Sequence, residues 1–381
     1  MSTIEYAAST IGYAMSMIGY AVSTVGDAVP TAEYPMSTIG VHKSRTDDVI
    51  VGLQKATALF QAYILPVIVC AGIFGNVLSV VIFTINKKRD TVSAQYLRVL
   101  AVTDSGMLLL SGLRAFIKWG IPYASGGHRE FDQMGFDLML KFAAACKIFR
   151  YLEHVCIFLS SMLIVVFSIE RVFAVWMPLE MSTIFTAKRR FKAIAALVVV
   201  GSLTKLHILA NFNANDRDGY STCWYQLDME GSLKISLGIY DMVSNQIIPC
   251  FLIFTLNIII AVGIRKSNSN VKLGTLEEER RSKRDMRCIV NLLCVSTAYF
   301  IFTTPRSVLW LYTDIVTFIV AKSDSSITRK YMSDMYQISL FGDNLTMLNY
   351  GCNFIIYGVS LNYYRETMNT ILMCRRSRKK A

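Results

Sequence analysis

The sequence predicts an all-α membrane protein: a seven-transmembrane helix bundle with a short amphipathic helix after the seventh span. Hydrophobic residues make up 53% of the 381 residues and charged residues only 17%, a balance that soluble domains rarely have. Seven apolar stretches are long enough to cross a bilayer, where a span needs about 20 residues and must be helical to satisfy its backbone. Short basic clusters flank these stretches on one side only, as expected for cytoplasmic loops.

The predicted bundle occupies residues 58–360. Glycine and proline inside it, such as Gly72, Pro249 and Pro305, are tolerated where neighbouring helices satisfy the freed backbone groups. The expected spans are 58–85, 95–119, 143–175, 191–210, 234–264, 286–313 and 334–360. Three outer loops, at about 120–142, 211–233 and 314–333, connect them.

The net charge of +12 fixes the expected orientation. Basic clusters follow span one, precede spans four and six, and close the chain, so the positive-inside rule places the N-terminus outside the cell. A nucleic-acid partner is not expected, because the clusters are short and border apolar spans.

Residues 1–57 precede the first span. Six degenerate copies of a seven-residue unit open this segment, from STIEYAA to STIGVHK. A coiled coil is disfavoured, because Gly, Ser and Thr recur at fixed places and no apolar a/d pair is accompanied by charged e and g positions. We predict a flexible, low-complexity extracellular tail without a signal peptide.

Residues 361–381 are expected to carry an amphipathic helix and a basic cytoplasmic tail. Apolar residues recur at helical spacing from Asn362 to Met373, which predicts a helix on the inner membrane surface in contact with lipid. Cys374 follows beside the basic tail, where either a palmitoyl group or a free thiol fits.

Most of the nine cysteines fall in spans, where packed thiols are expected. Cys146 and Cys223 instead fall at or beyond the outer membrane edge, in an oxidising compartment that favours a disulfide. No CxxC or Cys/His cluster in the sequence indicates a metal.

Several motifs, taken together in their order, resemble the rhodopsin-like (class A) G-protein-coupled receptors over about residues 58–374. In chain order they are Gly75-Asn76-Val77, Leu100–Asp104, Cys146 placed 25 residues before Arg171, Glu170–Leu179, Pro249, Pro305 and Asn353–Tyr357. The resemblance implies a plasma-membrane receptor that acts on a heterotrimeric G protein and then on arrestin. Span seven and the following helix resemble those of invertebrate neuropeptide receptors.

The sequence departs from the family's pattern at several positions. Phe354 stands where the family usually has proline, Thr303 where it has tryptophan, and Asn257 where it often has tyrosine. Gly201 or Ser202 falls near the usual span-four tryptophan. These changes indicate a divergent member with a modified activation relay.

The resemblance implies two sites inside the bundle. Asp104, Ser160, Asn349 and Asn353 match a mid-membrane polar cluster that holds a sodium ion in many members; the alternative is a protonated Asp104 in a hydrogen-bond network.

At the inner end, Glu170 is expected to hold Arg171 at rest and release it to the G protein, with Tyr357 in the span-seven motif. Asp285 either adds a second restraint or pairs with nearby Arg281 or Lys283 on a solvated face.

Charges towards the outside mark the expected ligand site, because charges in spans are by default functional and paired. Glu153, Arg306 and Asp343 are expected to face the central pocket, with Asp241 as a looser candidate. One interpretation is an internal Glu153–Arg306 ion pair, which leaves Asp343 for a cation on the ligand. Lys205 and His207 are expected to snorkel outward.

Three acids against one base favour a cationic ligand, and the charged outer loops suit a peptide, so an amidated peptide bearing arginine is the expected ligand. Met347 replaces the lysine that a retinal pigment needs. A small-amine or chemosensory receptor is the nearest alternative; a polytopic transporter or a non-signalling receptor belongs to a different class. No triad or metal-ligand pattern indicates an enzyme, and no cofactor other than sodium is expected.

Overall fold

The computed structural model describes most of the chain from Val51 onwards. The described residues are 51–85, 94–126, 137–177, 179–217, 220–226, 229–270, 293–310 and 326–372. The chain divides after Val51 into two compact units, and the elements below belong to the second, Gly52–Ala381. The predicted repeat tail, Asp285 and Cys374 lie outside the described residues.

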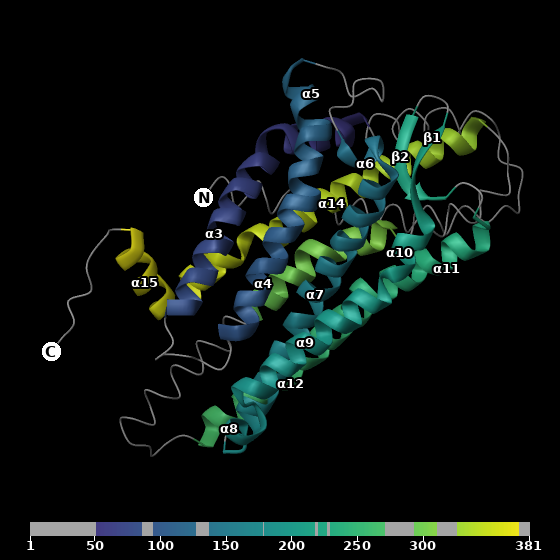
Figure 1. Ribbon diagram of the computed structural model, residues 1–381. Coiled ribbons are helices and arrows are strands. Elements are labelled where there is room, and N and C mark those ends of the chain that lie inside the picture. Colours follow the sequence, from purple (N-terminus) through teal and green to yellow (C-terminus); the bar gives the residue numbers. More distant parts are fainter. Residues whose placement is uncertain are drawn as a thin grey trace, which may run out of the picture. The chain divides into compact units, whose positions relative to one another are not determined.

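Helices dominate the described chain (Figure 1). Five helical segments within it are long and apolar enough to cross a membrane: Val51–Ile85, Ala94–Ala124, Ala143–Trp176, Ala187–Asn211 and Gly231–Ile264. Helical residues 293–310 and α14 (Ser326–Ser360) fall at the predicted sixth and seventh spans. Each predicted span is therefore helical where it is described, apart from an interruption at Lys205, and the seven-helix bundle is confirmed.

Several spans combine shorter helical pieces, whereas the third is a single helix. The first contains a π-helical turn (Phe60–Ile64) and α3 (Leu65–Ile85); the second contains α4 (Ala94–Met107), π-helical turns at Leu108–Leu113 and Phe116–Gly120, and α5 (Ile121–Ala124). The third is α7 (Ala143–Trp176), and the fourth joins α9 (Ala187–Thr204) to α10 (Leu206–Asn211). The fifth joins α11 (Gly231–Met242), a π-helical turn (Val243–Ile247) and α12 (Ile248–Asn270).

Helix α7 is the centre of the described bundle. Of the most apolar 18-residue stretch of α7, 67% is buried, whereas only 17% of the corresponding stretch of the fourth span is buried. Helix α7 packs against α4, α9 and α12. Leu163, Ile164 and Phe167 of α7 lie in the largest apolar core. By contrast, α9 and α12 expose apolar side chains such as Phe191 and Phe251, a surface that suits lipid rather than water.

Helices α3 and α14 approach each other closely at glycines. A Cβ atom added to Gly72 would lie 2.9 Å from the Gly351 Cα atom, which is too short for any side chain. One turn further along α3, a Cβ on Gly75 would lie 2.2 Å from the Phe354 ring. The glycine thus makes room for the phenylalanine that stands in place of the family's usual proline.

A two-stranded antiparallel sheet lies at one end of the bundle, which we call the hairpin end (Figure 1). It consists of β1 (Phe212–Arg217) and β2 (Tyr220–Tyr225), with Phe212 opposite Tyr225 and Ala214 opposite Cys223. This segment was expected to form an outer loop, and the sheet within it was not predicted. Asp218-Gly219 between two aromatic-containing runs was the available signal, because Asp-Gly favours tight hairpin turns.

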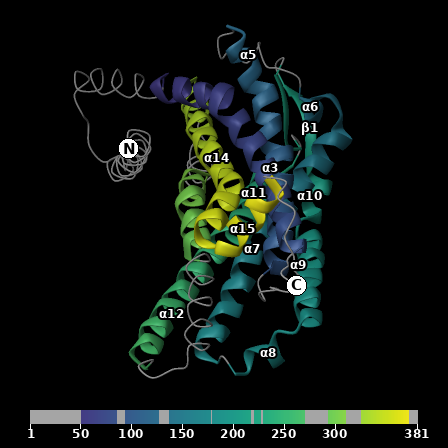
Figure 2. The ribbon, with the colours of Figure 1, turned by 90° about the vertical axis from the view of Figure 1, so that its left-hand side faces the viewer.

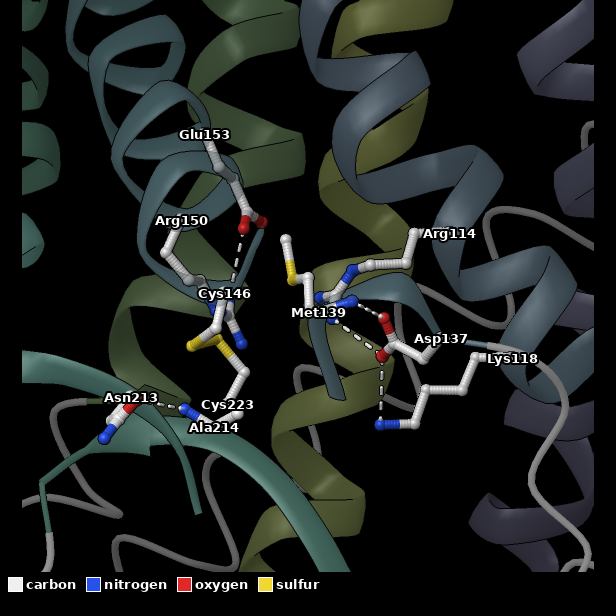
Figure 3. The surroundings of a disulfide bond; sticks show 10 residues. All are labelled: Arg114, Lys118, Asp137, Met139, Cys146, Arg150, Glu153, Asn213, Ala214 and Cys223. Carbon is white, nitrogen blue, oxygen red and sulfur yellow. Dashed lines mark hydrogen bonds and ion pairs between the residues drawn. A yellow bond between two sulfur atoms is a disulfide. The ribbon is translucent and has the colours of Figure 1, made fainter. Parts of the chain in front are cut away.

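The Cys146–Cys223 disulfide joins β2 to the beginning of α7, with the two Cα atoms 5.6 Å apart (Figure 3). Buried Met139, Ile208 and Phe212 surround it, together with the short helix α6 (Leu138–Lys141). The disulfide predicted from the sequence is therefore present, and it holds the hairpin against the third span.

Two short helices lie away from the hairpin end: α8 (Met181–Ile184) before the fourth span and α15 (Asn362–Leu372) after α14 (Figures 1 and 2). Tyr364 of α15 is fully buried, 2.7 Å from the Ser79 hydroxyl and with its ring centroid 5.7 Å from that of Phe83. The predicted helix after the seventh span is confirmed, and it docks against α3. Its contact with lipid stays a prediction.

Candidate functional site

A cavity of about 120 Å³ lies in the hairpin-end half of the bundle. Side chains from α7, the hairpin, the fifth span and residues 306–310 line it, so it is enclosed by spans three, five and six. Its lining residues are Arg150, His154, Ile157, Phe212, Tyr225, Gly238, Asp241, Met242, Asn245, Gln246, Arg306, Ser307 and Trp310. Of the four predicted ligand residues, Asp241 and Arg306 line the cavity, whereas Glu153 and Asp343 do not.

The predicted Glu153–Arg306 ion pair is wrong. Glu153 pairs with Arg150 one turn earlier on α7, with 3.0 Å between the Arg150 Nη1 and Glu153 Oε2 atoms (Figure 3). Arg306 instead pairs with Asp343, at 2.7 Å between Nε and Oδ1. Each acid is satisfied by the nearer guanidinium, so Asp343 is not left unpaired for a ligand.

Asp241 is the centre of a buried charge cluster that joins spans three, four and five. Lys205 Nζ lies 2.8 Å from its Oδ1 atom, and His207 Nε2 lies 3.0 Å from its Oδ2 atom. His154 of α7 lies 3.7 Å from the same Oδ2 atom, and Ser244 accepts a second hydrogen bond from Lys205 at 2.7 Å. The expected outward snorkelling of Lys205 and His207 is wrong: Lys205 is fully buried and His207 turns to Asp241.

The fourth span is interrupted at Lys205. This interruption explains why the Lys205 side chain points towards the fifth span and not outward. α9 ends at Thr204, α10 begins at Leu206, and Lys205 between them has φ −99° and ψ 2°, outside the helical region. A straight helix would present this side chain differently. The interruption aims it at α11, where the carboxylate compensates its buried charge.

A fourth charge group lies at the hairpin end of the second span. Asp137 is buried and lies 3.3 Å from Arg114 Nη1 and 3.4 Å from Lys118 Nζ (Figure 3). Its other oxygen accepts from the Met139 backbone N–H at 3.0 Å, which caps α6. An aspartate expected in a charged outer loop is therefore part of the bundle's packing.

These groups change the charge count on which the ligand prediction rested. Together they contain five basic residues, Arg114, Lys118, Arg150, Lys205 and Arg306, and four acidic residues, Asp137, Glu153, Asp241 and Asp343. Each of the four acids has a cation within 3.4 Å. The premise of three acids against one base is wrong, because Arg114, Lys118, Arg150 and Lys205 were left out.

Two amide side chains of the fifth span complete the cavity. Asn245 and Gln246 are 6% and 7% exposed, and both line it. Within the described chain, Asn245 Oδ1 and Gln246 Nε2 have no hydrogen-bond partner, and neither has Arg150 Nε. Buried polar atoms without partners are rare, so these three atoms are unused hydrogen-bonding capacity in residues that line the cavity.

In the middle of the bundle, three of the four residues of the predicted polar cluster contact one another. The Asp104 carboxylate is fully buried and accepts hydrogen bonds from Ser160 Oγ at 2.7 Å and Asn353 Nδ2 at 2.6 Å. Asn349 is also buried, and within the described residues neither atom of its amide has a partner.

The oxygen atoms of Asp104, Ser160, Asn349 and Asn353 are the donors that a hard cation prefers, so the residues present fit a sodium ion. When bound, the ion would neutralise the buried carboxylate. Ser160 and Asn353 also fit the alternative, a protonated Asp104 held in a hydrogen-bond network. Both interpretations remain in keeping with the contacts of the cluster.

At the end opposite the hairpin, Glu170 and Arg171 are both buried and adjacent. Arg171 Nη2 lies 3.8 Å from Glu170 Oε1, and the guanidinium carbon lies 5.3 Å from the Phe167 ring centroid. Tyr357 of α14 is fully buried, with its ring centroid 5.4 Å from that of Phe83. Asp285, the other residue predicted for this site, falls outside the described residues.

Comparison with known proteins identifies the family. The family described as "7 transmembrane receptor (rhodopsin family)" matches residues 75–357, most of the chain. The chain belongs to the rhodopsin family of seven-transmembrane receptors. The neuromedin-K receptor of Cavia porcellus is 24% identical over 297 residues, which cover 76% of this chain and 60% of the relative. The receptor described here thus spans about three fifths of that relative's length.

Two departures from the family pattern have a local structural role in this receptor. Asn257 of α12 donates a hydrogen bond to Ser296 Oγ at 2.7 Å, which links spans five and six directly. Thr303 is buried and donates to the Tyr299 carbonyl of its own helix at 2.6 Å. Their effect on activation stays a prediction.

Proposed function

We propose that this receptor binds an extracellular neuropeptide and activates a heterotrimeric G protein. The cavity at the hairpin end carries the proposal, because it combines charged and aromatic side chains with buried amides that lack partners. Such a mixture suits a ligand with several polar groups, as a peptide has. The name of the neuromedin-K receptor supports a peptide ligand by similarity.

The buried Glu170–Arg171 pair supports the signalling half of the proposal. A buried charged pair is costly to maintain and is most useful where it changes partner. We propose that Arg171 leaves Glu170 and meets the G protein when the ligand binds. A non-signalling receptor would have no such use for the arginine.

The family and the apolar helices support a multi-pass protein of the plasma membrane. We propose that the hairpin end and the N-terminus face outside, where a disulfide is stable. Sodium at Asp104, arrestin on the opposite face and a palmitoyl group on Cys374 belong to the same proposal.

Nucleotide exchange on a purified G protein, in membranes that contain the receptor, tests the function. Peptides are applied to the native receptor, to Arg171→Gln and to Arg98→Gln, a matched control on α4. We expect exchange from the native receptor and the control but not from Arg171→Gln, with all three at equal surface levels. Peptide-dependent ion current or substrate flux without exchange would instead favour a transporter.

A further inference from the structure

The cavity presents more positive than negative charge to its contents. Four titratable side chains other than tyrosine line it: Arg150, His154, Asp241 and Arg306. The acids that pair with the two arginines, Glu153 and Asp343, are not among its lining residues. A ligand entering the cavity therefore meets two guanidinium groups and a single carboxylate.

The Asp241 carboxylate already has basic partners and is therefore a poor site for a cation on the ligand. Asp241 already lies within 3.0 Å of Lys205 and His207 and within 3.7 Å of His154. An ammonium or guanidinium group on a ligand would be placed beside Lys205 and would have to displace an existing partner. Electrostatic repulsion and lost hydrogen bonds both oppose this.

Three buried polar atoms of the lining residues lack a hydrogen-bond partner within the described chain, and two of them are donors that need an acceptor. Arg150 Nε and Gln246 Nε2 are donors, and a carboxylate offers acceptor sites only. Asn245 Oδ1 is the complementary acceptor, which a peptide N–H or a water can satisfy. Donors with neighbouring guanidinium charge are the usual means by which proteins recognise carboxylates.

We propose that the ligand places a carboxylate in this cavity, held by Arg150, Arg306 and Gln246. The inference rests on the proposed receptor function and specifies the ligand: a peptide with a free C-terminal carboxylate or an acidic side chain, rather than an amidated, arginine-bearing one. The Arg306–Asp343 and Arg150–Glu153 pairs orient both guanidinium groups and compensate their charge until the ligand arrives.

The experiment uses a library of short peptides, each in matched forms. One pair differs only at the C-terminus, carboxylate against carboxamide, and a second pair replaces Asp or Glu by Asn or Gln. G-protein nucleotide exchange is measured on the native receptor and on two double variants, Arg150→Gln with Glu153→Gln and Arg306→Gln with Asp343→Asn. Each double variant removes an ion pair without leaving a buried charge alone.

We expect at least one carboxylate form to activate with an EC50 about tenfold or more below that of its neutral match, as loss of a charge-assisted bond requires. Each double variant should reduce that preference to about twofold while activation persists. Lys147→Gln is the control: it lies one turn from Arg150 on α7 and does not line the cavity, so it should leave the preference unchanged.

Preferential activation by carboxamides, or a carboxylate preference that survives in both double variants, would overturn the assignment and leave the receptor function intact. Absence of exchange with every peptide, at normal surface levels, would count against the receptor function on which the assignment rests. The two failures are therefore distinguishable.

Discussion

Replacing Lys205 by methionine tests whether the buried charge cluster is needed for folding. Methionine keeps most of the length of the side chain but removes the charge 2.8 Å from Asp241. Removing one partner of a buried pair costs about 3–5 kcal/mol, because the other charge remains uncompensated. His207 lies 3.0 Å from the same carboxylate and keeps its hydrogen bond to it, so we expect the lower end, about 3 kcal/mol. That is about a hundredfold fall in the ratio of folded to unfolded receptor.

The double variant Lys205→Met with Asp241→Asn removes both charges and should recover most of this loss, to within about 1 kcal/mol of the native receptor. Unfolding in mixed detergent micelles, together with surface expression, measures both variants. Lys188→Met, an exposed lysine on the same helix, is the control.

A Lys205→Met receptor as stable as the native one would refute this reasoning. So would a double variant less stable than the single one, since it would mean that the two side chains do not compensate each other. Labelling of Lys205 by an amine reagent dissolved in the lipid would restore the original prediction of an outward-facing lysine.

Three other changes test the remaining sites. Cys223→Ser releases the hairpin, and for a disulfide that closes a loop of 77 residues we expect a loss of about 2–5 kcal/mol in the unfolding assay. Asp104→Asn should abolish any difference in agonist affinity between sodium and choline buffers; a difference that persists would remove the ion from this cluster. Glu170→Gln should raise ligand-free nucleotide exchange several-fold over Glu180→Gln, and equal basal rates would argue against a resting restraint on Arg171.

The sequence predicted the bundle because hydropathy depends on composition over about 20 residues, which tertiary detail does not alter. The disulfide was predicted because Cys146 and Cys223 fall at or beyond the outer membrane edge, and the polar cluster because Asp104 and Asn353 stand at the positions of the family's motifs. Both kinds of signal are properties of whole spans or of the family. Neither depends on the rotamer of one side chain.

The charge partners depended on features that spacing does not encode. The turn of Lys205 towards α11 requires a helix interruption at a residue that is neither glycine nor proline, so no composition signal marked it. The Arg306–Asp343 pair depends on the relative rotation of two spans. The Arg150–Glu153 pair, in contrast, has an i,i+3 spacing and was available from the sequence.

The two arginine–carboxylate pairs at the cavity differ in which parts of the bundle would shift if the pair were broken. Arg150 and Glu153 are on the same helix, so parting them reorients side chains while α7, buried and uninterrupted, stays in place. Arg306 and Asp343 join the sixth and seventh spans, and Pro305 directly precedes the arginine, where a span bends most readily. A carboxylate that competes with Asp343 for Arg306 would therefore loosen a contact between two spans.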